Sequence, residues 1–324
     1  MKAVVYTHYG PTDVLQIKEI NMPVPNHDEV LIKIHATTVN RTDNATIKGI
    51  PFFARIITGL FKPKKQTPGT ELAGVVVTVG DKVTAFKPGD RVFGFNDTGT
   101  QSQAEYTSVK QQFLASMPEG NNFEEMAPSM EGAHYAQNFI NKITIEKDQE
   151  ILVNGATGGI GSAAVQLLRT YDVTITAVCS EKNIDLVKGL GADRIIAYEI
   201  TDFTHDNQQY DYVFDTVGKS SFFKCQNILK PGGIYISSDL GYLAQNLFLP
   251  SIAPVLKLLF NKKHTRFPNP ADIPGSIQLV KNLIEQGKVK ADIDRTYPLN
   301  EIINAYKYVE QGHKLGNVVI KVVE

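Results

Sequence analysis

A glycine-rich turn in the middle of the chain limits the possible folds more than any other feature. Residues 151–162 read I-L-V-N-G-A-T-G-G-I-G-S, an apolar run that passes into glycines and then into a helix-forming segment. Gly155, Gly158 and Gly161 stand three residues apart, which allows a tight turn, close approach of a pyrophosphate and close packing of a helix on a sheet. The run predicts a dinucleotide site with phosphates at the helix N-terminus, rather than a turn that only caps a helix.

Strands and helices alternate around this turn. We expect strands at 150–154, 173–178, 194–197, 212–215 and 234–237, and helices at 123–141, 159–169, 184–190 and 221–229. Repeated strand–helix–strand units predict an α/β fold with a doubly wound parallel sheet, in which ligands bind at the carboxyl ends of the strands.

The segment before the alternating region has a different rhythm. Short alternating stretches at 30–35 and 74–79 predict a mostly β domain with one short helix at 40–48 and an irregular excursion at 51–65. The strand at 318–323 is expected to return to this domain. We therefore predict one domain from residues 1–120 and 288–324, and a dinucleotide-binding domain from residues 121–287.

Charge and apolar content limit the partners. The 33 basic and 34 acidic residues give a net charge of −1, and no long lysine or arginine run suggests a nucleic acid or a membrane surface. The expected partner is a small molecule, and the absence of a signal-like start predicts a cytoplasmic protein. The apolar stretch at 247–260 is expected to be core or a dimer contact, and two cysteines exclude a four-thiolate metal site.

Eight segments along the chain resemble the zinc-free quinone oxidoreductase branch of the medium-chain dehydrogenase/reductase superfamily. Besides the glycine turn they are K-A-V-V-Y-T-H-Y-G-P-T-D-V-L at the start, V-N-R-T-D at 39–43, P-G-T-E-L-A-G-V-V at 68–76, F-K-P-G-D-R-V-F-G at 86–94, G-L-G-A-D at 189–193, F-D-T-V-G at 214–218 and L-K-P-G-G at 229–233. The resemblance implies a Rossmann domain, a GroES-like catalytic domain and a homodimer.

The same resemblance bears on metal binding. Zinc-containing members hold the catalytic metal with a Cys, a His and a further Cys or Asp. This chain has Asn40, Thr70 and Met130 at or near those positions. None of these side chains is a good Zn²⁺ ligand, so we expect a protein without zinc.

Cofactor contacts are implied along the carboxyl edge of the sheet. They are Gly155, Ala156, Thr157, Gly158, Gly159, Ile160 and Gly161 in the turn, with Val217, Ser237 and Ser238 after later strands. An acid at the end of the second strand would favour NADH, whereas Cys179 and Ser180 are uncharged, so we expect NADPH. Ser180, Lys182 and Tyr198 are the implied contacts of its 2′-phosphate. Glu181 beside the site, and Asn183 where relatives have a lysine, keep NADH open.

Asn40 and Asp43 are three residues apart at a helix start. They are either a helix cap or a catalytic pair, in which the Asn40 amide donates to a substrate carbonyl and Asp43 orients its neighbours or contacts Arg41. Tyr6 and Arg41 are further candidates for the substrate cleft.

Glu131 and His134 share a helix face just before the nucleotide domain. They are either a satisfied polar pair or part of the site. In the second case Glu131 would contact substrate and His134 would donate a proton or hydrogen bond near the nicotinamide.

The leading hypothesis is an NADPH-dependent, metal-free reductase of quinones or activated enones. Such acceptors are electrophilic enough for positioning and a hydrogen bond to suffice. Two alternatives remain: an alcohol dehydrogenase or aldehyde reductase that replaces zinc with side-chain donors, and a non-catalytic NADPH-binding protein.

Overall fold

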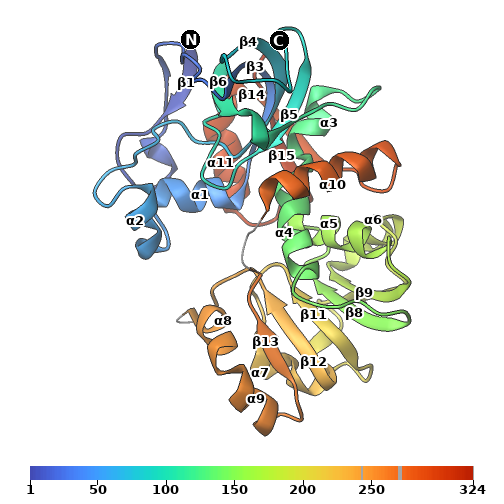
Figure 1. Ribbon diagram of the computed structural model, residues 1–324. Helices are drawn as coiled ribbons and strands as arrows, with labels where there is room; N and C mark the ends of the chain where they lie inside the picture. The colour runs from blue at the N-terminus through green and yellow to red at the C-terminus, as the bar shows by residue number, and fades with distance from the viewer. Residues whose placement is uncertain (242–243, 269–271, 324) are drawn as a thin grey trace. The chain divides into compact units, whose positions relative to one another are not determined.

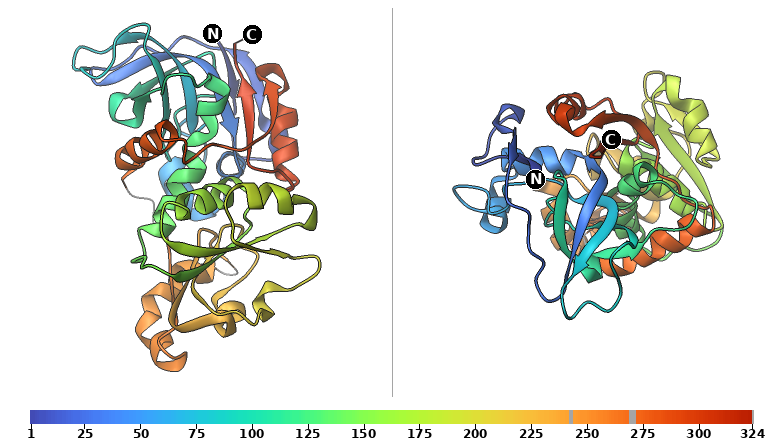
Figure 2. Two further views of the ribbon diagram at one scale, coloured as in Figure 1. Left: turned by 90° about the vertical axis from the view of Figure 1, so that its right-hand side faces the viewer. Right: turned by 90° about the horizontal axis from the view of Figure 1, so that it is seen from above.

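The computed structural model describes residues 1–241, 244–268 and 272–323 and contains two compact units. The first unit combines Met1–Glu131 with Asp272–Glu324, and the second is Gly132–Ala271 (Figure 1). The first unit is therefore built from both ends of the chain, and the N- and C-termini lie near each other on it (Figures 1 and 2).

The first unit is rich in β-structure. Its strands are β1 (Lys2–Val5), β2 (Gln16–Glu19), β3 (Glu29–Val39), β4 (Glu71–Val79), β5 (Arg91–Phe95), β6 (Tyr106–Lys110), β7 (Leu114–Ser116), β14 (Ile293–Pro298) and β15 (Asn317–Lys321). Seven of them form one sheet in the order β14-β15-β3-β4-β5-β7, with β6 on β3, and β1 pairs with β2. This is the mostly β domain that the alternating pattern predicts.

The described residues of the first unit form five α-helices. They are α1 (Arg41–Lys48), α2 (Arg55–Thr58), α3 (Phe123–Met126), α10 (Ile273–Glu285) and α11 (Ile302–Glu310). A core of residues from both chain ends joins β3, α1, α11 and β15, with Val39, Ile47, Ile302, Tyr306 and Val318 all buried. Because α3 packs on β3 and β4, and α10 packs on β5 and β7, both boundaries of this unit lie nearer the middle of the chain than predicted.

The second unit is a doubly wound sheet. Its strands are β8 (Gln149–Asn154), β9 (Val173–Cys179), β10 (Arg194–Ala197), β11 (Tyr210–Asp215), β12 (Leu229–Ser237) and β13 (His264–Arg266). All neighbouring pairs are parallel, and the order is β10-β9-β8-β11-β12-β13. The chain reverses its direction of winding between β8 and β11, which is where such sheets bind their ligands.

Helices cover both faces of this sheet. They are α4 (Glu131–Ile140), α5 (Gly159–Leu168), α6 (Ile184–Gly189), α7 (Phe222–Cys225), α8 (Gln245–Phe248) and α9 (Ala253–Leu259). In Figure 1, α5 and α6 lie beside β8 to β10, and α7 and α9 lie beside β12 and β13.

Two local expectations are corrected. The helix expected at 123–141 is interrupted by a 3₁₀ turn, Ala127–Ser129, at Pro128, because proline lacks the N–H that a continuing helix needs. The helix expected at 221–229 ends at Cys225.

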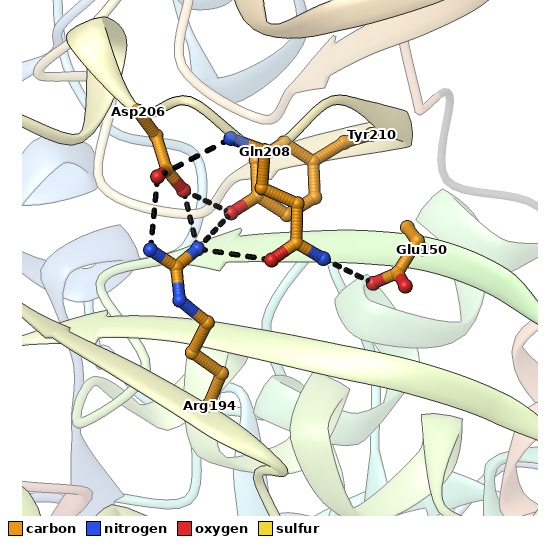
Figure 3. A network of polar contacts seen from close by, with 5 residues as sticks. All are labelled: Glu150, Arg194, Asp206, Gln208 and Tyr210. Carbon is orange, nitrogen blue, oxygen red and sulfur yellow. Dashed lines mark hydrogen bonds and ion pairs between the residues drawn. The ribbon is translucent and has the colours of Figure 1, made fainter.

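An ion-pair network connects β8, β10 and β11 of the second unit (Figure 3). The Arg194 guanidinium donates to both carboxylate oxygens of Asp206 and to the Tyr210 hydroxyl, and the Tyr210 hydroxyl donates to Asp206. Gln208 accepts from Arg194 at 3.2 Å and donates to Glu150 at 2.6 Å. Arginine first, and Tyr210 after it, lower the pKa of Asp206 to about 2. Every acid and base here has a partner, so we assign this network a structural role.

Candidate functional site

Two glycines of the central turn are required by packing. Gly155, which follows β8, has a φ of +84°, and a Cβ on it would lie 2.4 Å from Cγ1 of Val217. A Cβ on Gly161, in the first turn of α5, would lie 2.1 Å from the Gly155 carbonyl oxygen. Any side chain at either place would force the strand, the turn and the helix apart.

Gly158 differs from these two glycines because space adjoins it. The nearest atom to a Cβ built there is the Gly155 carbonyl oxygen at 3.6 Å. Gly158 also caps the N-terminus of the ten-residue helix α5. A missing side chain beside the free N–H groups of a helix start leaves room for a phosphate, so the residues present fit a dinucleotide.

A buried carboxylate that the sequence analysis missed shapes the loop after β11. Asp215, fully buried, accepts from Gly218 N–H and Ser220 N–H at 3.0 Å each, and from the Asn154 amide at 3.0 Å. The Tyr235 hydroxyl donates to it at 2.8 Å. Asp215 thus ties together the ends of β8, β11 and β12, and its place in F-D-T-V-G at a strand end was the available signal.

The remaining predicted cofactor contacts lie along the same edge. Ala156 is buried, Thr157, Gly159, Ile160 and Ser238 are partly exposed, and Val217 stands next to Gly155. Ser237, buried at the end of β12, accepts from Asp239 N–H at 3.3 Å. No described contact assigns any of these residues to a cofactor, so their roles remain predictions.

An acid stands at the predicted 2′-phosphate contacts. The Ser180 hydroxyl donates to Glu199 at 2.5 Å, and Glu181 N–H donates to the other Glu199 oxygen at 3.0 Å. The Ser180 bond is the main cause that lowers the pKa of Glu199, which keeps it ionised. Lys182 and Tyr198 are exposed. Glu199 follows β10, one strand beyond the place where an acid is sought, and so it escaped the sequence analysis.

The first unit contains a buried cluster of carboxyl groups centred on Glu71. One oxygen of Glu71 accepts from Met130 N–H at 2.9 Å and Glu131 N–H at 2.6 Å. The other accepts from the Thr38 hydroxyl and the Asn40 amide at 2.9 Å each. Burial, and then the charge of Glu131, nevertheless raise the pKa of Glu71 to about 7.

Glu131 lies beside Glu71 and is held by two threonines. Thr42 donates to one of its oxygens at 2.8 Å and Thr70 to the other at 2.6 Å. Burial raises the pKa of Glu131, and the two hydroxyls oppose that shift. Lys314, partly buried, supplies a nearby positive charge, and its own pKa is lowered by burial.

Asp43 is the third acid of the cluster. It accepts from Asn40 N–H at 2.8 Å, which caps α1 as the helix-cap interpretation requires. Burial, and then the charge of Glu131, raise the pKa of Asp43 well above its usual value. Tyr6 is also buried, and burial is the first cause that raises its pKa. With three acids so close, full ionisation of the cluster is unfavourable at neutral pH.

The Asn40 amide has both of its hydrogens in internal bonds. It donates to Glu71, as described, and to the Thr38 hydroxyl at 3.1 Å. Donation to a substrate carbonyl would require one of these bonds to be exchanged. Arg41 is exposed at the first position of α1 and, among the described residues, forms no ion pair with Asp43.

The three metal-ligand positions contain residues that do not fit zinc. The Thr70 hydroxyl donates a hydrogen bond to Glu131, and the Asn40 amide donates one to Glu71. Met130 is buried in the core. Zinc sites in proteins use thiolate, imidazole and carboxylate ligands, whereas these positions offer a neutral hydroxyl, a neutral amide and a thioether, which are poor ligands for Zn²⁺. Within the described ranges, no group of three or more His, Cys, Asp or Glu residues is placed to hold a metal.

Glu131 and His134 do not form the polar pair considered from the sequence. Both Glu131 oxygens are occupied by threonines, whereas His134, fully buried in the second unit, has Nε2 at 3.1 Å from the Asn138 amide nitrogen. The structure therefore brings Asn40, Asp43 and Glu131 together. His134 belongs to a separate buried contact.

Comparisons with known proteins agree with this architecture. Residues 26–119 match the alcohol dehydrogenase GroES-like domain, and residues 190–320 match the zinc-binding dehydrogenase family. The chain is 32% identical to the quinone-oxidoreductase homolog of Spinacia oleracea, over 99% of this chain and 98% of that one. It is 31% identical to the chloroplastic NADPH-dependent alkenal/one oxidoreductase of Arabidopsis thaliana, over 99% of this chain and 79% of that one.

A solved structure shares the fold. The quinone oxidoreductase of Coxiella burnetii superposes with a TM-score of 0.85 at 24% identity, covering 100% of this chain and 99% of the other. The chain is thus an oxidoreductase with a GroES-like unit and a Rossmann unit. Because the relationship to curated proteins extends over nearly the whole length, the chain belongs to the medium-chain dehydrogenase/reductase superfamily, in its quinone oxidoreductase branch.

Proposed function

We propose that the protein reduces quinones or activated enones with NADPH and without a metal ion. The observation that carries this proposal is the hydrogen bonding of the Thr70 and Asn40 side chains. Both stand where metal-binding relatives have ligands, and both donate into buried carboxylates instead. A site without a Lewis acid needs an acceptor that is already electrophilic, and conjugated carbonyl compounds are such acceptors.

The second unit supplies the cofactor positions in this proposal. The turn at Gly158 would hold the pyrophosphate, and Asp215 would fix the loop that includes Val217. When bound, the reduced nicotinamide supplies a hydride to the acceptor. A quinone then gains that hydride and one proton to become a hydroquinone, and an enone gains the same two to become a saturated ketone.

The proton has two candidate sources in the proposal, water and His134. His134 is buried and faces the Asn138 amide, so its use would require that contact to open. Water needs no such rearrangement. We therefore favour water as the proton source, with His134 as the alternative.

NADPH is the preferred cofactor in the proposal, and Glu199 is expected to reduce the preference for NADPH over NADH. Lys182 and Tyr198 are exposed next to Ser180, where they could meet a 2′-phosphate. Glu199 already occupies the Ser180 hydroxyl, and its negative charge opposes a phosphate there. The relative from Arabidopsis thaliana is named as NADPH-dependent, which supports the same choice.

The test is steady-state oxidation of NADPH and NADH, in parallel, against ortho-quinones, para-quinones, enones and aldehydes. Each assay uses protein treated with a chelator and untreated protein. We expect quinones or enones to be reduced at the same rate by both samples, and simple aldehydes to react poorly.

Two results would contradict the proposal. One is stoichiometric zinc in fresh protein whose removal abolishes turnover. The other is reduction of aldehydes alone, which would favour an alcohol dehydrogenase. Stabilisation by NADPH without turnover of any acceptor would instead indicate the non-catalytic alternative.

A further inference from the structure

Two acids on strand β11 have different partners. Asp211, near the amino end of the strand, is partly buried and forms an ion pair with Lys230 at 2.7 Å. Asp215, the last residue of the strand, is fully buried. Within the described part of the chain, no lysine, arginine or histidine lies within ion-pair distance of Asp215. The carboxyl end of β11 therefore contains a buried acid without a base.

Five hydrogen bonds hold the Asp215 carboxyl group, and in all of them the partner is the donor. Oδ1 accepts from the Asn154 amide at 3.0 Å, and Oδ2 accepts from the Tyr235 hydroxyl at 2.8 Å. The other three donors are N–H groups of the loop after β11, those of Val217, Gly218 and Ser220. A carboxyl group that only accepts hydrogen bonds is stabilised in its ionised form.

The negative charge of Asp215 is dispersed by these donors but not cancelled, because an amide, a phenol and backbone N–H groups are all neutral. Its effect reaches a neighbouring side chain. Burial, and then the charge of Asp215, raise the pKa of the Tyr235 hydroxyl. A charge in a buried environment is screened weakly and therefore acts on groups that it does not touch.

The loop after β11 extends this negative potential. Its three N–H groups point towards Asp215, and a trans peptide group directs its carbonyl oxygen opposite to its N–H. The carbonyl oxygens of Thr216, Val217 and Lys219 therefore point away from the carboxylate. Hydrogen bonding to a charge polarises these peptide groups further. The side of the loop away from Asp215 thus presents negative partial charges.

Strand order assigns this part of the sheet to one half of a dinucleotide. β9 and β10 lie on one side of β8, and β11 and β12 lie on the other. Folds of this kind bind the ribose of the adenosine half at the end of the strand that corresponds to β9, and the pyrophosphate at the turn after β8. The nicotinamide half is then left with the ends of β11 and β12, where Asp215 lies.

We propose that Asp215 shifts the redox equilibrium of the bound cofactor, because its charge favours the oxidised nicotinamide ring over the reduced one. Loss of a hydride to the acceptor changes the ring from neutral to positively charged. A fixed negative charge at this end of the sheet stabilises the product of that change. The hydride carries two electrons to the acceptor, which also gains one proton, as described above. Asp215 touches neither reactant and acts through the loop.

This role of Asp215 rests on the proposed function for its hydride donor, but it concerns the cofactor and not the acceptor. Without a Lewis acid to activate the acceptor, more of the driving force has to come from the donor. A buried carboxylate near the nicotinamide supplies that driving force by making the reduced cofactor a stronger donor. The role can be tested separately from the function, because cofactor binding is measured without any acceptor.

The experiment measures the dissociation constants of NADP⁺ and NADPH for the full chain. NADPH is titrated by its fluorescence, and NADP⁺ is titrated by competition with NADPH. In Asp215→Asn, we expect the ratio of the constant for NADP⁺ to that for NADPH to rise by roughly three- to tenfold. A tenfold rise corresponds to about 30 mV in the potential of a two-electron couple.

The ratio separates an effect of charge from an effect on structure. Asp215 also holds the loop in place, so Asp215→Asn is expected to weaken the binding of both forms of the cofactor. Loss of loop geometry alone would raise both constants by the same factor and leave their ratio unchanged. The same ratio measured with NAD⁺ and NADH shows whether the effect is independent of the 2′-phosphate, as we expect.

The matched control is Asp211→Asn. It removes the same charge from the same strand, at a distance of about 13 Å from Asp215 along the strand. Because Asp211 is near the amino end of β11, away from the ligand edge of the sheet, the ratio should be unchanged. The control also leaves Lys230 without its partner, so the change in net charge is the same in both variants.

A second variant changes the donors and keeps the charge. Tyr235→Phe removes one hydrogen bond from Asp215 and retains the aromatic ring in the core. The charge of Asp215 is then less dispersed, so we expect the ratio to fall by roughly twofold. Thermal unfolding shows which variants are folded. Tyr235→Phe therefore provides a test even if Asp215→Asn does not fold.

Three results would overturn this role of Asp215. They are an unchanged ratio in folded Asp215→Asn, an equal rise in Asp211→Asn, and a ratio that does not fall in Tyr235→Phe. Reduction of quinones by a protein with one of these results would remove the role and leave the proposed function. The expected ratios in a protein that reduces no quinone or enone would remove the proposed function and leave the role.

Discussion

The cluster around Glu71 and the network around Arg194 bury acids in opposite ways. In the first, three carboxyl groups lie together, and mainly hydroxyl, amide and backbone N–H groups stabilise them. In the second, Asp206 faces an arginine and a tyrosine. The pKa of Glu71 is raised to about 7 and that of Asp206 is lowered to about 2. Burial thus raises the pKa of an acid whose donors are mostly neutral, whereas an arginine partner outweighs burial and lowers it.

The largest expected effect comes from emptying the centre of the first cluster. Glu71→Ala leaves four hydrogen-bond donors without an acceptor, two of them backbone N–H groups. We expect the free energy of unfolding to fall by about 3–5 kcal/mol. Urea unfolding measures this loss, with Glu105→Ala at an exposed contact as the control. A loss no greater than that of the control would show that the donors find water instead.

The next largest effect is a change in how stability depends on pH, which tests the raised pKa of Glu71. The folded state binds a proton at Glu71 up to about pH 7, whereas the unfolded chain releases it near 4.5, so this group's contribution to stability falls as pH rises between those values. Glu131→Gln removes the neighbouring charge and keeps a partner for both Thr42 and Thr70. As the pH rises from 5 to 8, we expect the free energy of unfolding of the variant to increase by about 1 kcal/mol relative to that of the unaltered protein.

Urea unfolding at several pH values measures that gain. The control is Glu105→Gln, at an exposed contact outside the cluster. A difference between Glu131→Gln and the unaltered protein that stays constant with pH would mean that Glu131 does not influence the titration of Glu71.

A smaller effect on stability is expected at Asp206, the acid that pairs with Arg194. Arg194→Met removes the ion pair with Asp206 but leaves the Tyr210 hydroxyl as a donor. Because Arg194 is partly exposed, we expect a loss of about 1 kcal/mol at neutral pH. The sign of the pH dependence is opposite to that of Glu71. The contribution of Asp206 is complete above its unfolded pKa near 3.8 and is lost as pH falls towards 2.

The variant and the unaltered protein should therefore converge in stability as the solution is acidified, which urea unfolding between pH 2 and pH 5 would detect. Arg169→Met, at a more exposed pair with Asp193, is the control and should cost less. A difference that grows in acid would contradict the assigned role of Arg194.

The smallest effect concerns Glu199, an acid that is neither buried nor paired with a base. Glu199→Gln should raise the ratio of kcat/KM for NADPH over NADH several-fold, because an exposed charge acts weakly on a neighbouring phosphate. Lys182→Gln should move the ratio in the opposite direction. If both variants leave the ratio unchanged, the 2′-phosphate lies elsewhere. Binding of 2′-phospho-ADP-ribose against ADP-ribose gives the same comparison without turnover.

The architecture was predictable because its signals are local. The glycine spacing after an apolar strand identified β8 and α5, and Arg194–Ala197 was placed at the bounds that β10 has. The carboxyl cluster was not predictable in the same way. Asn40 and Asp43 are neighbours in sequence, but Glu71 and Glu131 reach them only through the folding of β4 and the turn before α4.

Exposure was equally hidden from sequence. An apolar stretch such as 247–260 reads the same whether it faces the core or solvent, and α9 does both. Glu199 was missed because the rule for cofactor preference looks at one strand end, whereas the carboxylate here arrives from the adjacent strand. Such contacts depend on which strands are neighbours in the sheet, and the strand order is difficult to predict from a single sequence.

The pairing of β15 with β3 has a consequence for biosynthesis. Val318 stands opposite Val39, so this pairing forms only after residues up to Val318 have left the ribosome. The parallel sheet of the second unit needs only residues up to about 266 and can form earlier. Until β15 emerges, the backbone groups along one edge of β3 have no strand partner. We expect the nascent chain to depend most on a chaperone during this interval.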